Sequence, residues 1–150
     1  MQFFQAEAYR SSHQPFSVCC PGGIMEKRLL EEKDMTTREE AIRLCMELPG
    51  VYEDYPFDDG NWTVMRHGSN KKIFAAIFQH QGCMWMNVKA EPSWGDFWRS
   101  TFDAVVPAYH MNKLHWVSVI LDGSMSEEEI RRLVHDSYRL TAPKKPVRKR

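Results

Sequence analysis

The chain has 150 residues, a length that suits one domain rather than two. Basic residues (Lys and Arg) and acidic residues (Asp and Glu) number 20 each, so the net charge is zero. This balance argues against a strongly polyanion-binding composition and against an acidic disordered chain. No apolar run approaches the roughly 18 residues of a membrane-spanning helix, and the first residues lack the basic and apolar regions of a secretory signal.

Three segments are expected along the chain. Residues 1–35 form an N-terminal extension that is expected to be partly disordered, with a charged run after Met25 that is compatible with a short helix. Residues 36–142 form the domain and carry 11 basic and 15 acidic residues, a net charge of −4. Residues 143–150 carry five basic residues and no acid, and two prolines and like-charge repulsion predict a disordered tail. This tail is either a solubilising terminus, the commoner case, or an arm that binds phosphates.

Within the domain, local signals mark the helices and strands. A threonine followed three residues later by glutamate, at Thr36 or Thr37, predicts a capping box, and Pro49-Gly50 ends that helix. Short turns between apolar runs predict an antiparallel meander. Beyond the first helix, the expected elements are a loop over 52–61, strands over 62–66, 73–78 and 83–89, a helix from Pro92 with an aromatic stripe (Trp94, Phe97, Trp98, Thr101, Phe102), strands over 104–107 and 115–121, and a last helix capped by Ser126 with Glu129.

The resulting order, α-β-β-β-α-β-β-α, predicts an α+β fold in two layers, with an antiparallel sheet and helices on one face. Alternation along the third and last strands places Met86 and Val119 toward the helices. The opposite face then carries Trp85, Trp116 and Lys89. An open face of this kind suits base stacking or a protein partner. The alternative is that loops or the extension cover these tryptophans.

The cysteines are Cys19, Cys20, Cys45 and Cys83, and they form no Cys-x-x-Cys pair. Adjacent Cys19 and Cys20 have poor geometry for a bond to each other. The pattern predicts reduced thiols, small buried hydrophobes rather than reactive or metal-binding groups, and therefore a cytoplasmic location.

Short motifs are spread between Thr36 and Thr141. They are Thr37-Arg38-Glu39-Glu40, Leu48-Pro49-Gly50-Val51, Glu53-Asp54, Pro56-Phe57, Lys72-Ile73-Phe74-Ala75, Asn87-Val88-Lys89 with Pro92, Pro107-Ala108-Tyr109-His110-Met111-Asn112-Lys113 before His115-Trp116, Asp122-Gly123 and Ser137-Tyr138. Through these motifs the chain resembles the MmcQ/YjbR family of small bacterial proteins. The resemblance implies a two-layer α+β fold similar to frataxin-like and secretion-chaperone-like domains. It also implies DNA binding, through hairpins that look like a double-wing motif, and no catalytic activity.

Basic side chains around the first expected hairpin can contact phosphates without strict spacing, although exposed turn lysines are also typical of ordinary surfaces. Lys89 and Lys113 are expected to form a second contact cluster, bracketed by His110 and His115. The predicted nucleic-acid-binding residues are Arg66, Lys71, Lys72, Lys89, His110 and Lys113.

Catalytic and metal chemistry has weak support in the sequence. His110 and His115 do not match a metal-ligand spacing, and neither does the acidic turn from Asp58 to Asn61, which is expected to bond its own backbone. No Gly-x-Ser-x-Gly elbow or glycine-rich phosphate loop accompanies the candidate nucleophiles Ser118, Ser137 and Cys83. No metal, cofactor or membrane partner is expected.

Two functions remain. The first is a non-catalytic module that binds DNA weakly and in a salt-sensitive manner. The alternative is a protein-interaction or homodimerising domain that uses the face with Trp85 and Trp116.

Overall fold

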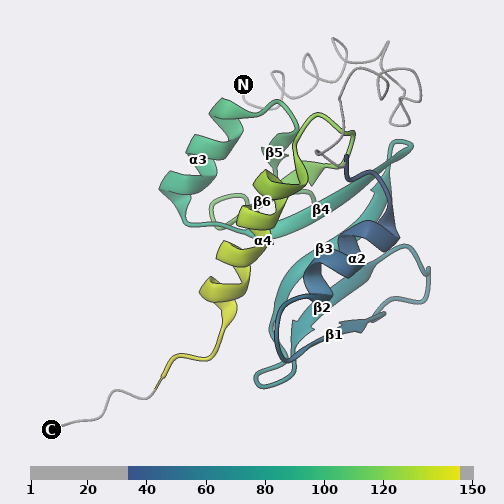
Figure 1. Ribbon diagram of the computed structural model, residues 1–150, viewed down its shortest axis with the longest axis vertical. Helices are drawn as coiled ribbons and strands as arrows, with labels where there is room; N and C mark the ends of the chain where they lie inside the picture. Colours follow the sequence, from purple (N-terminus) through teal and green to yellow (C-terminus); the bar gives the residue numbers. More distant parts are fainter. Residues whose placement is uncertain (1–33, 146–150) are drawn as a thin grey trace, which may run out of the picture.

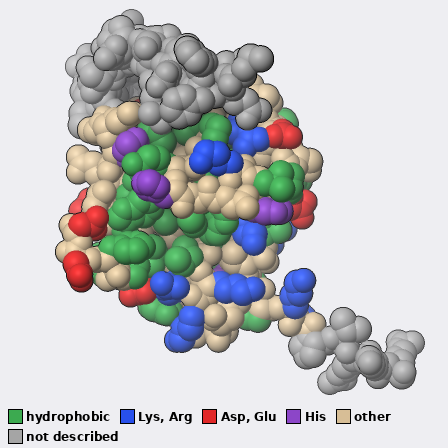
Figure 2. All heavy atoms as spheres, turned by 180° about the vertical axis from the view of Figure 1, so that it is seen from behind, with side chains coloured by type: hydrophobic (Ala, Val, Ile, Leu, Met, Phe, Trp, Pro, Cys, Tyr) green, Lys and Arg blue, Asp and Glu red, His purple; other side chains and the backbone are tan. Residues whose placement is uncertain are grey.

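A six-stranded antiparallel sheet with helices against one face makes up the described part of the protein, residues 34–145 of a computed structural model (Figure 1). Figure 2 shows the molecule from the opposite side. The strands lie in the order β1-β2-β3-β4-β6-β5, which confirms the predicted α+β class. In chain order the elements are α2 (Arg38–Met46), β1 (Val51–Asp54), β2 (Thr63–His67), β3 (Ile73–His80), β4 (Cys83–Lys89), α3 (Pro92–Thr101), β5 (Val105–Pro107), β6 (Trp116–Ile120) and α4 (Glu127–Thr141).

Strand β1 was missed, because most of it falls in the segment expected to be a loop. It pairs antiparallel with β2, with Val51 opposite His67 and Asp54 opposite Val64. Only four residues long and with no fully buried side chain, this edge strand has almost no alternation of burial. Acidic residues are also poor strand formers. The order is therefore α-β-β-β-β-α-β-β-α, one strand more than predicted.

The predicted capping boxes at the start of α2 and of α4 are confirmed. The Thr37 side chain accepts a hydrogen bond from Glu40 N, and the Glu40 carboxylate accepts one from Thr37 N, so Thr37 rather than Thr36 is the N-cap of α2. Ser126 and Glu129 form the same reciprocal pair at the start of α4. Each box satisfies backbone N–H groups that the first turn of a helix leaves without partners.

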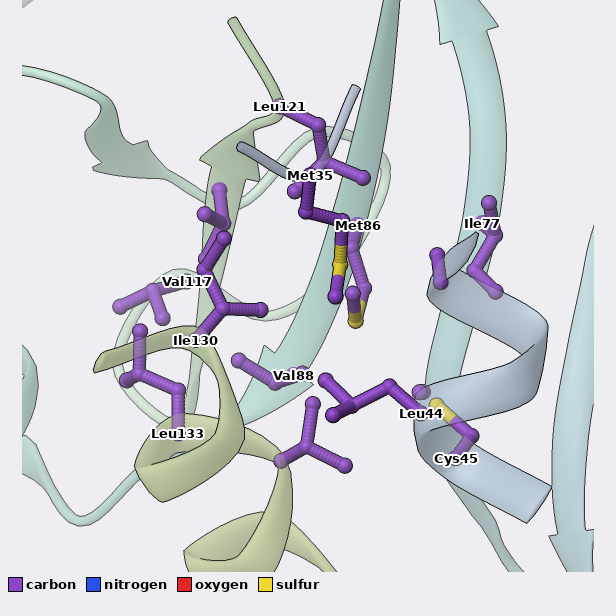
Figure 3. Close-up of a cluster of buried hydrophobic side chains, with 14 of the residues drawn as sticks. Met35, Leu44, Cys45, Ile77, Met86, Val88, Val117, Leu121, Ile130 and Leu133 are labelled. Carbon is purple, nitrogen blue, oxygen red and sulfur yellow. The ribbon is translucent and has the colours of Figure 1, made fainter. Parts of the chain in front are cut away.

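The main core lies between the sheet and the helices, where α2, α4 and Trp98 of α3 pack on β3, β4 and β6 (Figure 3). Met35 is only 2% exposed within this core, and Asp34 forms an isolated bridge with Ser126. The domain therefore begins before residue 36. The short helix expected after Met25 and the end of the basic tail lie outside the described residues.

Two cysteines in the described part differ in state. Cys45 is a free thiol buried against the core, and burial raises its pKa to about 12, which makes it unreactive. Cys83, at the start of β4, is disulfide-bonded. The expectation of reduced thiols is therefore wrong at Cys83.

The buried hydroxyl of Ser137 joins α4 to the end of the β3–β4 ladder. Pairing of β3 with β4 ends at Ala75 opposite Val88. Beyond that pair, Lys89 N donates to Ser137 Oγ at 2.8 Å, and Ser137 Oγ donates to Phe74 O. The hydroxyl thus takes the position of the next bond in the ladder, and it holds α4 at the end of β4.

We predict that Ser137→Ala lowers the free energy of unfolding by about 1–3 kcal/mol, because Lys89 N and Phe74 O would be left buried without partners. Urea denaturation measures this. Ser100→Ala, which removes an exposed hydroxyl that bonds within α3, is the matched control and should change stability by less than about 0.5 kcal/mol. Equal effects of the two substitutions would contradict the bridging role.

Candidate nucleic-acid interface

The register of the sheet brings basic residues from separate segments to one end. The turn between β2 and β3 carries Lys71 and Lys72, and Arg66 pairs with Ile73 just before this turn. Because β4 runs antiparallel to β3, with Ala75 opposite Val88, β4 finishes beside the start of β3. Lys89, the last residue of β4, therefore lies at the same end of the sheet as the turn.

The C-terminal end of α4 reaches this end as well. Thr141 hydrogen-bonds to the β2–β3 hairpin through two contacts, with His67 Nε2 at 2.8 Å from Thr141 Oγ1 and Asn70 Nδ2 donating to Thr141 O at 2.9 Å. The chain therefore leaves α4 next to the turn, and exposed Lys144 and Lys145 follow. Figure 2 shows Lys and Arg side chains gathered at this lower end of the molecule, where the C-terminal segment departs.

We call Lys71, Lys72, Lys89, Lys144 and Lys145 the basic end. None of the five forms an ion pair with a carboxylate of residues 34–145. Lys71 has a positive φ of 63°, and its ammonium lies 5.1 Å from the centre of the Tyr52 ring, a cation–π contact that leaves its charge available. Lys71, Lys72 and Lys89 therefore share one end of the fold, and their binding of nucleic acid stays a prediction.

Arg66 does not contribute a free charge. Its Nε donates to Asp54 Oδ2 at 2.7 Å, and its Nη1 donates to Lys71 O at 2.9 Å. The carboxylate partner comes from β1, the strand that was not foreseen, so this neutralisation was invisible in the sequence. Arg66 supports the hairpin turn rather than offering a phosphate contact.

His110 lies apart from Lys89 and Lys113. The His110 ring lies 6.4 Å from that of Trp62, next to Thr63, which pairs with Ile77 toward the far end of β3. Lys113 lies nearer to Lys89: its carbonyl accepts a hydrogen bond from Arg99 at 3.4 Å, and the nearby His115 O accepts one from Ala90 N at 2.9 Å. The six residues predicted to bind nucleic acid therefore do not all lie at one place in the fold.

The face with Trp85 is closed, which corrects the expectation of an open stacking or partner surface. The loop after β5 crosses it, with Tyr109 N donating to Ser118 Oγ at 2.9 Å and Asn87 Nδ2 donating to Tyr109 O at 2.7 Å. Trp85 is only 3% exposed, in a second small core with Phe78. The predicted alternation places Trp85 on the correct face of the sheet. On that face, however, the buried side chains of Asn87 and Ser118 hydrogen-bond to the loop that carries Tyr109.

Trp116 remains half-buried at the start of β6, opposite Lys89.

The candidate nucleophiles Ser118 and Ser137 are both fully buried and serve as hydrogen-bond bridges. The acidic turn bonds its own backbone as expected, with Asn61 N donating to Asp59 Oδ1 at 3.0 Å.

Sequence reasoning missed a pocket of about 340 Å³ between the start of α3 and the end of α4. The sequence predicted that the aromatic residues of α3 share one stripe. Of the three within the helix, Trp98 is buried, whereas Trp94 is 54% and Phe97 47% exposed. An i, i+3, i+4 spacing of aromatics resembles a core stripe whether or not a partner element covers it. The pocket is lined by Lys89, Ala90, Glu91, Trp94, Trp98, Leu133, Asp136, Arg139 and Leu140.

The fold and this site define a small two-layer α+β domain with cations collected at one end of its sheet. The chain belongs to the YjbR family, whose family model matches residues 46–140. It is 33% identical to YyaQ of Bacillus subtilis (strain 168), over 71% of this chain and 99% of that protein. It is 35% identical to YbdF of Escherichia coli O157:H7, over 68% of this chain and 81% of that protein.

Solved structures agree with this assignment. The crystal structure of the Deinococcus radiodurans protein DR2400, with a DUF419 domain, matches with a TM-score of 0.67 and 32% identity, over 76% of this chain and 84% of that one. A Pseudomonas syringae crystal structure matches with a TM-score of 0.64 and 27% identity, over 71% of this chain and 99% of that one. In the described part of the chain no helix is both long and apolar enough to cross a membrane.

We predict that His67 makes stability depend on pH. Burial lowers the pKa of His67 below its ordinary value of 6.5, the carbonyl of Tyr138 opposes this shift, and the charge of Lys72 adds to it. The neutral form is therefore favoured in the folded state, and its contribution is present above pH 6.5 and lost as the pH falls through the lowered folded pKa.

In urea denaturation from about pH 8 to about pH 5, the free energy of unfolding should fall, and His67→Gln should make that fall shallower. His135→Gln, at an exposed position on α4, is the control and should leave the pH dependence unchanged. A His67→Gln profile parallel to that of the wild type would contradict this role.

Proposed function

We propose that this protein is a non-catalytic DNA-binding protein that contacts phosphates through the basic end. The observation that carries the proposal is the convergence of lysines from the β2–β3 turn, β4 and the tail at one end of the sheet, with no carboxylate of the described residues paired to them. Lysines on several segments can follow a phosphate backbone without reading bases. A cytoplasmic location is also proposed, although the disulfide at Cys83 removes the argument from reduced thiols.

The affinity should be modest. Residues 36–142 carry a net charge of −4, which opposes the approach of a polyanion outside the basic end. Non-specific binding has dissociation constants of about 10⁻⁴–10⁻⁶ M at physiological salt, and each neutralised phosphate contributes about −0.9 to the slope of log K against log salt. Five lysines in contact would give a slope of about −4 to −5.

The test is a titration of labelled duplex DNA with the full chain at several salt concentrations, with and without reductant because Cys83 is disulfide-bonded. Lys72→Ala and Lys89→Ala should each weaken binding and reduce the salt slope by about 1. Arg66→Ala should have a smaller effect, because Asp54 already neutralises that side chain. Arg132→Ala removes an exposed cation on α4 that is paired with Glu128, and it serves as the control outside the basic end.

The result that overturns the proposal is an absence of binding at low salt, or lysine variants that match Arg132→Ala. A chain that ends at Ala142 separates the tail from the body. If this shortened chain loses all binding while Lys72→Ala and Lys89→Ala have no effect in the full chain, the tail is the binder and the folded body is not.

The alternative function is a homodimer or protein contact through the face with Trp85 and Trp116. Trp85 cannot take part in such a contact, because it is only 3% exposed. Trp116, which is half-buried, is the remaining tryptophan of the proposed contact face. Sedimentation of the full chain distinguishes the two: a concentration-dependent dimer that is abolished by Trp116→Ala would favour the alternative.

A further inference from the structure

The pocket between α3 and α4 has the chemistry of a binding site. Its volume of about 340 Å³ falls in the range of small-ligand pockets, about 300–1,000 Å³. Trp98, Leu133 and Leu140 supply apolar surface, and Trp94 stands 54% exposed at its side. Phe97 contacts the Trp94 ring in a T-shaped arrangement at 5.5 Å between centroids, and Trp94 still keeps more than half of its surface exposed.

Charged side chains also line this pocket. Lys89 lines the pocket, forms no ion pair within residues 34–145, and belongs to the basic end. Glu91 lies two residues later and is exposed, while Asp136 is already paired with Arg139. The pocket therefore offers one free cation, one exposed carboxylate and an aromatic ring.

An unpaired nucleobase attached to its phosphate complements this combination. Its flat ring can stack on Trp94, its phosphate can meet Lys89, and an exocyclic amino group can donate to Glu91. The location also fits, because Lys89 connects the pocket to the cations that would hold the adjoining phosphates. A paired base cannot enter without being unstacked, which costs a few kcal/mol.

We infer that the α3–α4 pocket takes an unpaired base, so the preferred ligand of the basic end is single-stranded rather than duplex DNA. This inference rests on the proposed function and specifies its substrate. Stacking of one base on one aromatic ring changes affinity by about tenfold.

The experiment compares three labelled probes of one length with the full chain: a single strand, its duplex, and an abasic strand that keeps the phosphates and removes the bases. The wild type should bind the single strand about tenfold more tightly than the other two. Trp94→Ala should remove this preference and leave duplex binding unchanged. Phe57→Ala, at another aromatic that is 54% exposed but does not line the pocket, is the control and should keep the preference.

Intrinsic fluorescence gives a second readout. The single strand should quench the wild-type emission, the abasic strand should not, and Trp94→Ala should lose the quenching. The inference is overturned if the single strand and the abasic strand bind equally, or if Trp94→Ala and Phe57→Ala behave alike. Lysine-dependent binding to all three probes with no effect of Trp94 would leave the proposed function standing and remove only the pocket. No binding to any probe would remove both.

Discussion

The hydroxyl of Ser137 is the contact on which the arrangement of this end of the molecule depends. It accepts from Lys89 N and donates to Phe74 O where the β3–β4 ladder stops. An unpaired backbone group in the interior costs free energy comparable to a lost hydrogen bond, and the Ser137 hydroxyl gives both of these backbone groups a partner where α4 packs on the sheet. The last turns of α4 lie beside Lys89 at this point, and together with α3 they line the pocket.

A second tie, from Thr141 to the hairpin through His67 and Asn70, sets where the chain leaves α4. The rings of His67 and Tyr138, with centres 4.5 Å apart, pack beside this tie. The two ties are less than one and a half helical turns apart on α4, so a short stretch of one helix organises three basic segments. The electrostatic character of this end is therefore a product of packing rather than of composition, since the whole chain is neutral.

Features set by neighbours in sequence were the ones that could be predicted. Capping boxes at Thr37 and Ser126 and the antiparallel meander depend on residues a few positions apart. Strand β1 could not be recognised, because its stability comes from pairing with β2 and not from its own acidic composition. The closing of the Trp85 face was equally hidden: it requires Tyr109, Asn87 and Ser118 to meet across strands. Arg66 failed as a candidate for the same reason, since Asp54 reaches it only through β1.

The two outer strands of the sheet are the shortest, four residues in β1 and three in β5. Pro107 ends β5 and lacks the N–H that an added strand would need, and exposed Glu53 places a carboxylate on β1. Short, charged or proline-bearing borders are how sheets avoid templating further strands. The sheet formed by residues 34–145 is thus poorly suited to growing by backbone pairing with other polypeptides at its two edges.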